Sequence, residues 1–251
     1  NAYRNVIPTG VIAGNDGRKM SKSLGNYTSP DELMDRYSAD SLRFLLLASP
    51  LLNGEDYALL DKDVSDVARK LAMIWNMYDF FTMYAEVDEF TFPYDTSSSD
   101  AFLVRRITDT APRSDTPESS TGTENSFQIS VDIDKLSNPL DRWIVSRVHQ
   151  LTDHVAKFMN QYNIPDALSA VIPFIDDASN WYVRRSRRRF WKSEDDADKA
   201  QAYQTLHYVL VRLSLVLAPF TPFLAEELYQ HLTGGESVHL LNWPTDNPVD
   251  E

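Results

Sequence analysis

The sequence has 251 residues, 43% of them hydrophobic and 24% charged, and its lack of cysteine excludes a disulfide scaffold, thiol catalysis and thiolate zinc sites within these residues. Because 24 Lys and Arg stand against 37 Asp and Glu, the net charge of −13 argues against a protein that coats nucleic acid, unless a local basic patch exists. No apolar run approaches the ~20 residues of a membrane span and no leader pattern opens the chain, so we expect a cytoplasmic protein without a membrane partner.

The first predicted elements are short strands. Residues 4–8 are typical of a strand entered part-way through a sheet, and because the chain opens on Asn1 rather than Met we expect a fragment of a longer polypeptide. Asn15-Asp16-Gly17 separates residues 11–13 from residues 18–20, and an Asp-Gly pair supplies the positive φ angles of a tight turn. The pattern therefore predicts a small β-hairpin.

Helical signals follow the hairpin. Ser29-Pro30-Asp31-Glu32 is a capping box with proline at the first helical position, which predicts a short helix to about Tyr37. A second helix is expected around residues 42–47, ending before Pro50. Residues 51–60 then form a connector.

Amphipathic helices account for most of the remaining chain, because apolar side chains recur there at three- and four-residue spacing. The expected helices are, in order, residues 61–84, 139–162, 165–192 with a bend at Pro173, 197–217, and 222–233. Short connections between the last four predict antiparallel neighbours, which form a helical bundle.

A stretch of different composition separates the first two of these long helices. Residues 91–137 are rich in Ser, Thr and Asp, so they offer little apolar area to offset the entropy lost on ordering. Short strands are expected at residues 102–107 and 127–133, on the flank of the bundle. We predict a flexible insertion without chemistry of its own.

The most informative stretch is residues 17–26, which contain Lys19 and Lys22 among small hydroxyl residues and between glycines. Lysine is a compact charge on a flexible stem, and serine hydroxyls and loop amides add hydrogen-bond donors. The pattern therefore suits a mobile loop that closes on a polyphosphate. The alternative is an ordinary solvated loop, which the residue types alone favour.

The string Lys19-Met20-Ser21-Lys22-Ser23 resembles the signature loop of class I aminoacyl-tRNA synthetases. The following residues resemble the isoleucine, valine, leucine and methionine enzymes, with Ser38 where those enzymes usually carry glycine. In this family the loop stabilises the pyrophosphate that leaves when the amino acid attacks ATP. The resemblance implies that Lys19 and Lys22 are catalytic, that Lys22 contacts ATP directly, and that the ATP-binding residues are Lys19, Met20, Ser21, Lys22 and Ser23, with Met20 as an apolar anchor.

Residues 184–189 contain five arginines in six positions within a predicted helix. At 100° per residue, one side of this helix carries a core stripe of Ile172, Ile175, Ser179, Val183, Ser186 and Phe190. The other side is basic with aromatic rims and holds Trp181, Arg184, Arg185, Arg188, Trp191 and Lys192. Two interpretations are open. Arginine and tryptophan can contact RNA phosphates and bases, or the arginines can pair with nearby acids such as Asp176, Asp177, Glu194, Asp195 and Asp196.

Residues 181–191 also resemble the anticodon-binding domain of the isoleucine-specific members of this family, and residues 140–144 and 217–228 resemble their helical domain. One departure is Pro173, inside a helix that is uninterrupted in those relatives. The resemblance implies that tRNA(Ile) is a partner and that the tRNA-binding residues are Trp181, Arg184, Arg185, Arg188, Trp191 and Lys192.

The expected fold is mostly α, with a helical anticodon-binding domain over residues 61–251 that includes the insertion at 91–137. Residues 1–60 would be the β-hairpin and helices that end a Rossmann-type catalytic domain. The implied reaction is ATP-dependent attachment of isoleucine to tRNA(Ile) through isoleucyl-adenylate, with ATP bound as its magnesium complex.

The catalytic half that binds ATP and isoleucine lies outside these residues, so the fragment alone is expected to be inactive and monomeric. No tightly bound cofactor is expected, and the five histidines lack metal-ligand spacing. Two alternatives stay open at this point. One is a valine-specific enzyme of the same family, and the other is a non-catalytic RNA-binding or scaffold protein that kept the loop.

Overall fold

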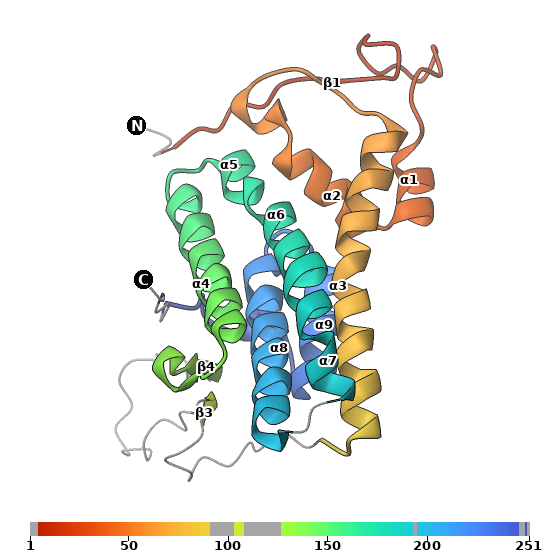
Figure 1. Cartoon of the computed structure of the whole chain (residues 1–251). Coiled ribbons are helices and arrows are strands. Elements are labelled where there is room, and N and C mark those ends of the chain that lie inside the picture. The colour runs from red at the N-terminus through yellow and green to blue at the C-terminus, as the bar shows by residue number, and fades with distance from the viewer. Residues whose placement is uncertain (1–4, 91–102, 108–126, 193–194, 246–248, 250–251) are drawn as a thin grey trace, which may run out of the picture.

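The computed structural model describes residues 5–90, 103–107, 127–192, 195–245 and 249. Long helices lie side by side along most of its length, and two small sheets sit at opposite ends of the bundle (Figure 1). The predicted mostly helical architecture is therefore confirmed. Within the described residues, no helix combines the length and the hydrophobicity that a membrane span requires.

The N-terminal sheet differs from the predicted hairpin. Strand β1 (Ile12–Ala13) pairs in parallel with β2 (Tyr57–Ala58), so its main partner lies far along the chain. Only one antiparallel bridge, between Ala13 and Lys19, remains of the hairpin. The turn still forms, and Gly17 adopts φ 73°. Residues 5–8, which we expected as a strand, are irregular in the structure.

Two short helices follow at the predicted places. Helix α1 (Pro30–Tyr37) begins at Ser29, whose Oγ accepts a hydrogen bond from the N–H of Glu32, as a capping box requires. Helix α2 (Ala39–Ala48) ends just before the short helix η1 (Pro50–Asn53), and Gly54 closes η1 with φ 83°. The capping box placed α1 and the apolar run before Pro50 placed α2, whereas η1 lies in the segment that we expected as a connector.

The four longest helices that were predicted from apolar spacing build the core. They are α3 (Asp61–Val87), α4 (Pro139–Met159), α8 (Asp196–Leu217) and α9 (Pro222–Thr233), with the short helix η4 (Val238–Leu240) after α9. Asn138 caps α4, Asp195 caps α8, and Gly234 ends α9 with φ 65°. Most of their apolar side chains join one hydrophobic cluster, in which Ile74, Val148 and Leu210 are fully buried. Burial of this shared face is what stabilises the bundle.

The third predicted long helix is divided. It consists of α5 (Ile164–Ser169), α6 (Val171–Asp176), the π-helical segment η3 (Asp177–Val183) and α7 (Arg184–Trp191). The expected single helix with a bend at Pro173 is therefore wrong. Pro173 has no N–H to donate to the carbonyl of Ser169, so α5 ends there, and the N–H of Phe174 starts the next helix on Ala170 at 3.1 Å.

The predicted strands of the insertion are present. Strand β3 (Leu103–Ile107) pairs antiparallel with β4 (Phe127–Val131), and the short helix η2 (Ile133–Lys135) follows. Val131 and Ile133 are buried in the main core, which attaches this end of the segment to the bundle. The predicted flexibility concerns residues that lie outside the described part of the chain.

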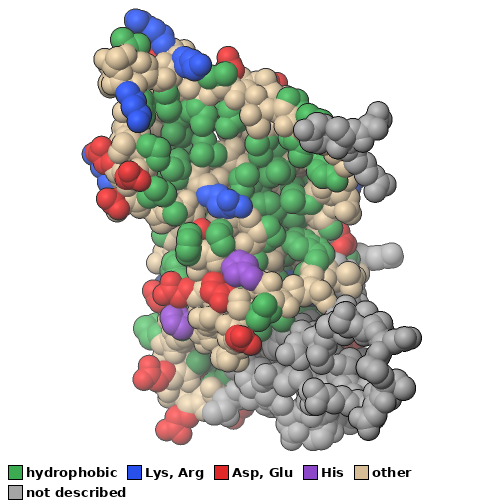
Figure 2. Space-filling view, turned by 180° about the vertical axis from the view of Figure 1, so that it is seen from behind, with side chains coloured by type: hydrophobic (Ala, Val, Ile, Leu, Met, Phe, Trp, Pro, Cys, Tyr) green, Lys and Arg blue, Asp and Glu red, His purple; other side chains and the backbone are tan. Residues whose placement is uncertain are grey.

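The N-terminal end of the molecule has its own small hydrophobic cluster and an apolar surface. Leu33, Leu42, Leu59 and Val64 form the cluster, which lies between α1, α2 and the first turn of α3. Figure 2 shows hydrophobic side chains gathered over the upper half of the face seen from behind, with Lys and Arg side chains near its top. A groove of about 370 Å³ runs between α2 and the start of α9, and its lining includes the exposed Phe223.

Candidate functional site

The lysine loop, defined as residues 17–26, is closed at its base by Asn26. The side chain of Asn26 accepts a hydrogen bond from the N–H of Ser21 at 3.0 Å and donates one to Asp16 at 2.9 Å. Gly14 makes room for this closure, because a Cβ there would lie 2.1 Å from the carbonyl oxygen of Asn26. Hydrogen bonds from the N–H of Arg18 and from Asn26 hold the pKa of Asp16 below its ordinary value. No sequence motif singled out Asn26, although short polar residues commonly close loops in this way.

The two lysines of the lysine loop face solvent. Lys19 and Lys22 are exposed, and no carboxylate in the described part of the chain forms an ion pair with either ammonium group. Asp16, the nearest acid in sequence, is paired with Arg18 at 3.6 Å instead. Beside the lysines, the hydroxyl oxygens of Ser21 and Ser23 lie 2.8 Å apart. Two positive charges and a pair of hydroxyls without an acidic partner suit an anion as ligand.

Met20 anchors the lysine loop to the fold. Its side chain is half-buried and packs against the small hydrophobic cluster of Leu33, Leu42, Leu59 and Val64. The two lysines flank this anchored residue at positions 19 and 22. The loop is therefore held at Met20 and Asn26, while its charged side chains stay free to move.

The second group of predicted site residues lies on α7 and the segment before it. Arg184, Arg185, Arg187 and Arg188 are exposed, and none of the four forms an ion pair or a hydrogen bond to an acid that the structure describes. Arg187 was not among the predicted contacts, and its guanidinium lies 5.8 Å from the ring centre of Phe80 on α3. We call these four side chains the arginine face.

Two tryptophans flank the arginine face. Trp181 is 50% exposed, and the guanidinium of Arg185 lies 4.6 Å from the centre of its ring. Trp191 is 62% exposed at the other end of α7, next to the exposed Lys192. The structure thus brings all six predicted tRNA contacts to the surface. An arginine stacked on an exposed indole suits both a phosphate and an unpaired base.

The buried side of this segment differs in part from the predicted stripe. Val183, Ser186 and Phe190 are buried as expected, whereas Ile172 and Ser179 are only half-buried. Tyr182, which a regular helix would not place on that stripe, is fully buried. The cause is the π-helical segment η3, because its wider hydrogen-bond spacing changes the angle between successive side chains.

Three of the five nearby acids that could have neutralised the arginine face have other partners, and a fourth, Asp196, lies exposed in the first turn of α8 and forms no ion pair, within the described residues, with any arginine of the face. Asp176 pairs with Lys70 of α3 and Asp177 pairs with Arg147 of α4, both at 2.8 Å. Asp195 accepts hydrogen bonds from the first N–H groups of α8. The ion-pair interpretation therefore fails for these acids, while Glu194 lies outside the described residues.

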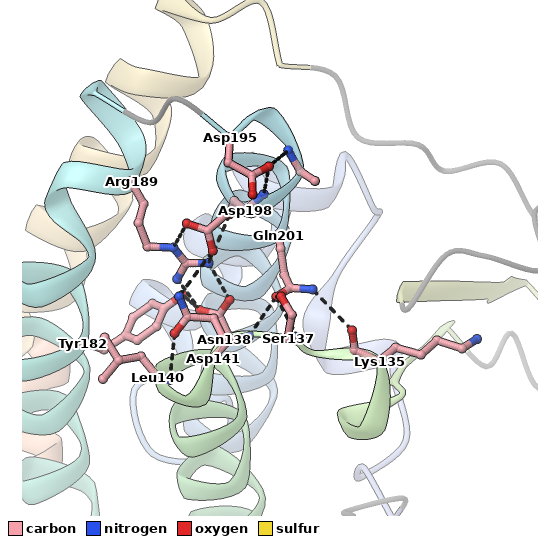
Figure 3. A network of polar contacts seen from close by, with 11 residues as sticks. Lys135, Ser137, Asn138, Leu140, Asp141, Tyr182, Arg189, Asp195, Asp198 and Gln201 are labelled. Carbon is pink, nitrogen blue, oxygen red and sulfur yellow. Dashed lines mark hydrogen bonds and ion pairs between the residues drawn. The ribbon is translucent and has the colours of Figure 1, made fainter.

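Arg189 is the exception among the five arginines, and Figure 3 shows its surroundings. Its side chain is only 11% exposed and makes hydrogen bonds of 2.7–2.8 Å to both oxygens of Asp141 and both oxygens of Asp198. The hydroxyl of Tyr182 donates to Asp141 at 2.7 Å. We call these four residues the Arg189 clamp. Sequence analysis missed the clamp, because its members are brought together only by the packing of α4, α7 and α8.

Protonation in the Arg189 clamp follows from burial and charge. Burial alone would lower the pKa of Arg189, but its hydrogen bonds to Asp141 and Asp198 outweigh this and raise the pKa above its ordinary value. Burial and the negative charge of Asp141 raise the pKa of Tyr182. The clamp is therefore a charged guanidinium held by two carboxylates and a neutral phenol.

The lysine loop and the arginine face lie near opposite ends of α3 (Figure 1). Val64, in the first turn of α3, belongs to the cluster that anchors Met20. Phe80, further along the same helix, packs against Phe190 with ring centres 5.0 Å apart. Sixteen helical residues between Val64 and Phe80 span about 24 Å at 1.5 Å per residue. One small ligand cannot occupy both sites, whereas a large one can reach both.

Within the described residues, no group of three or more His, Asp or Glu side chains is arranged to hold a metal ion. Two of the histidines are instead part of the core. His149 lies 2.6 Å from the hydroxyl of Tyr208, and His207 lies 2.9 Å from the carbonyl oxygen of Leu232. These contacts explain the two buried imidazoles as structural groups.

Comparison with protein families gives two matches. Residues 1–58 match the model described as tRNA synthetases class I (I, L, M and V), and residues 141–251 match the anticodon-binding domain of tRNA ligase. The first match contains the lysine loop, and the second contains the arginine face. The chain therefore carries class I tRNA synthetase domains, the second of them of the anticodon-binding type.

Curated relatives are similar to the chain along nearly its whole length. The isoleucine–tRNA ligase of Treponema pallidum (strain Nichols) is 36% identical over 99% of the chain, and that of Chlamydia trachomatis (serovar D) is 38% identical over 97%. The chain spans only 20–21% of the length of these relatives. The similarity therefore concerns about a fifth of each relative.

Solved structures share the fold of the chain. The LeuRS of Agrobacterium radiobacter K84, in a ternary complex with tRNA and LeuAMS, superposes with a TM-score of 0.60 at 19% identity, over 94% of this chain and 23% of that one. The methionyl-tRNA synthetase of Mycobacterium tuberculosis, in complex with methionyl-adenylate, gives 0.56 at 21% identity, over 88% of this chain and 36% of that one. At these identities the likeness establishes the fold alone.

Proposed function

We propose that the chain is part of an isoleucine–tRNA ligase, which attaches isoleucine to tRNA(Ile) through isoleucyl-adenylate with consumption of ATP. The arginine face carries the proposal. Its four arginines form no ion pair with any acid that the structure describes, and they lie in the part of the chain that matches an anticodon-binding domain. The names of the curated relatives favour isoleucine over the valine alternative. The enzyme is taken to be cytoplasmic and monomeric, as the resemblance implies.

In this proposal the lysine loop acts on the departing pyrophosphate. Lys22 contacts ATP, bound as its magnesium complex, and Lys19 adds a second positive charge. Ser21 and Ser23 donate hydrogen bonds to phosphate oxygens, while Met20 keeps the loop on the small cluster. The lysines place charge where negative charge develops in the reaction, and this lowers the barrier to adenylate formation.

The arginine face would bind the anticodon stem-loop. Arg184, Arg185 and Arg188 would neutralise phosphates, and Trp181 and Trp191 would stack on exposed bases with Lys192 beside them. We place the boundary between the catalytic part and the anticodon-binding domain near residue 60. The helix α3, which starts there, would then connect the two sites.

The test of the arginine face is a salt titration of tRNA binding. We expect the chain to bind tRNA(Ile) more tightly than tRNA(Val), with an affinity that falls steeply as salt rises. Arg184→Ala and Arg188→Ala should each reduce the slope of log Kd against log salt by about one, because each removes one phosphate contact. Filter binding or fluorescence anisotropy over a salt series measures this slope.

The matched control for that titration is Arg36→Ala. Arg36 is an exposed arginine of α1 that pairs with Glu32, far from α7. Its removal should leave the slope unchanged. If all three variants have the same slope as the unmodified chain, the arginine face does not bind tRNA and the scaffold alternative gains support. Tighter binding of tRNA(Val) than of tRNA(Ile) would instead favour the valine alternative.

The test of the lysine loop needs the longer polypeptide that the proposal implies. Lys22→Ala in that polypeptide should slow isoleucine-dependent ATP–pyrophosphate exchange by about 100-fold or more, as is typical when one charge-stabilising donor is lost. Lys62→Ala, which removes an exposed lysine of α3, is the control and should have no effect. Unchanged exchange with Lys22→Ala would contradict a catalytic role for the loop.

A further inference from the structure

The chain places five arginines in six consecutive positions, and only one of them is turned inward. Arg189 meets Asp141 in the first turn of α4 and Asp198 in the first turn of α8, through five hydrogen bonds that include the backbone carbonyl of Asp198. The planar guanidinium matches both carboxylates, and such paired contacts fix direction as well as distance. The clamp therefore joins three helices at one side chain.

Besides the clamp, the rotation of α7 about its axis depends on its continuity with η3 and on Phe190, whose ring centre lies 5.0 Å from that of Phe80 and 4.9 Å from that of Tyr203. The helix has eight residues, follows the π-helical segment η3 without a side-chain cap, and buries only Ser186 and Phe190. A rotation by one residue turns the helix by 100° and would bring Arg188 to the position of Arg189. Because neighbouring residues are also arginines, the amino-acid types alone do not decide which one faces Asp141.

We propose that Arg189 is a positioning residue for the tRNA-binding surface. By engaging Asp141 and Asp198 it selects the orientation of α7 in which Arg184, Arg185 and Arg188 face solvent. Its role in tRNA binding rests on the proposed function, whereas its effect on α7 can be measured without RNA. Arg189 itself does not contact the tRNA.

A cysteine reporter tests the orientation of α7, because the chain has no cysteine of its own. Ser186 is fully buried and its hydroxyl has no hydrogen-bond partner among the described residues, so Ser186→Cys is a close fit. Adding Arg189→Lys, which keeps the charge but loses the paired geometry, should raise the rate of reaction with a thiol reagent about tenfold or more. Adding Arg188→Lys, the matched change at the exposed neighbour, should not.

A second reporter separates rotation of α7 from general loosening of the fold. Ser214 lies fully buried in α8, and Ser214→Cys should stay protected when Arg189→Lys is added. Equal acceleration at both reporters would show a merely structural role and overturn the proposal. No acceleration at Ser186→Cys would overturn it as well.

The RNA arm uses tRNA(Ile), Arg189→Lys and, as the matched control outside the arginine face, Arg36→Lys on α1. We expect Arg189→Lys to weaken binding about tenfold and to lower the salt slope by about one, although net charge is conserved. Arg36→Lys should keep both the affinity and the slope. Unchanged binding by Arg189→Lys, with the reporter at position 186 accelerated, would overturn the positioning role. If the unmodified chain binds no tRNA, the proposed function fails, and the thiol measurements still decide whether Arg189 orients α7.

A milder variant covers the case in which Arg189→Lys does not fold. Asp198→Asn removes one carboxylate from the half-buried side of the clamp and leaves the pair between Arg189 and Asp141 in place. Asp198→Asn should raise the rate of thiol reaction at Ser186→Cys and weaken the binding of tRNA(Ile), each by about threefold. Wild-type values in both measurements would contradict the proposal.

Discussion

At the scale of single residues, Ser38 has an unusual backbone. It joins α1 to α2 with φ 91° and ψ 152°, a conformation that glycine adopts readily and other residues rarely adopt. The related enzymes usually carry glycine at this position, as noted above from the sequence. The serine compensates in part, because its Oγ accepts a hydrogen bond from the N–H of Ser41 at 3.2 Å and so caps α2.

Ser38→Gly should therefore stabilise the chain. Relief of the backbone strain is worth about 1–3 kcal/mol, whereas replacing a serine cap by glycine costs only a few tenths. We expect a net gain of about 1 kcal/mol in the free energy of unfolding by urea. Ser38→Ala, which keeps the strain and loses the cap, should be less stable than the unmodified chain. A less stable glycine variant would contradict this explanation.

The buried imidazole of His207 makes the free energy of unfolding depend on pH. Burial between α8 and α9 lowers its pKa from 6.5 to about 4, against the opposing effect of the carbonyl of Leu232. Between these values the unfolded chain binds the proton and the folded chain does not, so the folded state loses stability as pH falls from about 6.5 to 4. The shift corresponds to about 3 kcal/mol at 1.36 kcal/mol per pKa unit.

His207→Gln isolates this contribution, because glutamine can still donate to the carbonyl of Leu232 but does not titrate. Urea unfolding at several pH values should show a steeper loss of stability toward pH 4 for the unmodified chain than for the variant. Parallel curves for the two proteins would mean that His207 does not titrate differently on folding.

At the scale of elements, α2 is attached to α9 through a cap supplied from a distant part of the chain. The buried carboxylate of Asp40 accepts hydrogen bonds from the N–H groups of Phe223 and Leu224 at 3.4 and 2.7 Å. Arg43, one turn later on α2, donates to the carbonyl of Pro219 at 3.0 Å. Burial raises the pKa of Asp40, although the two N–H groups oppose that change. These contacts join the part that carries the lysine loop to the bundle.

Asp40→Ala should lower the free energy of unfolding by about 2 kcal/mol, because it leaves the first N–H groups of α9 buried without an acceptor. Asp40→Asn retains one oxygen and should cost less. The control is Asp31→Ala, which removes an exposed acid from the first turn of α1 and should stay within about 0.5 kcal/mol. Equal values for Asp40→Ala and Asp31→Ala would show that Asp40 contributes nothing to this attachment.

At the scale of the whole molecule, two basic sites stand in a chain that is acidic overall. The net charge is −13, yet the lysine loop and the arginine face are local basic sites near opposite ends of α3, whose residues Val64 and Phe80 are about 24 Å apart. Two acids, Asp176 and Asp177, are paired with Lys70 and Arg147. Local fields at the two sites, and not the bulk charge, therefore determine which ligands the chain attracts.

This separation predicts independent effects at the two sites. In the proposed longer enzyme, Lys22→Ala should lower kcat and Arg188→Ala should raise the KM for tRNA(Ile). The double variant should lose kcat/KM by the product of the two single losses, within about 0.5 kcal/mol, because distant sites are additive. Steady-state aminoacylation of the four proteins measures this. A clear departure from the product would indicate that the two sites are coupled.

Local signals in the sequence were enough to place most of the elements. Ser29, Asn138 and Gly234 act on N–H and C=O groups within a few residues, and so they specified helix ends before any packing was known. The lysine loop and the arginine-rich helix were likewise visible as short strings. The parallel pairing of β1 with β2, the π-helical segment and the cap from Asp40 depend on partners dozens of residues away or on packing, and the sequence alone did not reveal them.

The sequence by itself therefore determined where the helices begin and end and which two stretches carry excess positive charge, because these properties depend on neighbours along the chain. The tertiary structure decided which of the five arginines are available to a ligand. Asp176 and Asp177 were brought to Lys70 and Arg147, and Asp141 was brought to Arg189. A charge is neutralised by whichever partner the fold places within a few ångströms, and that distance is set only when the helices pack.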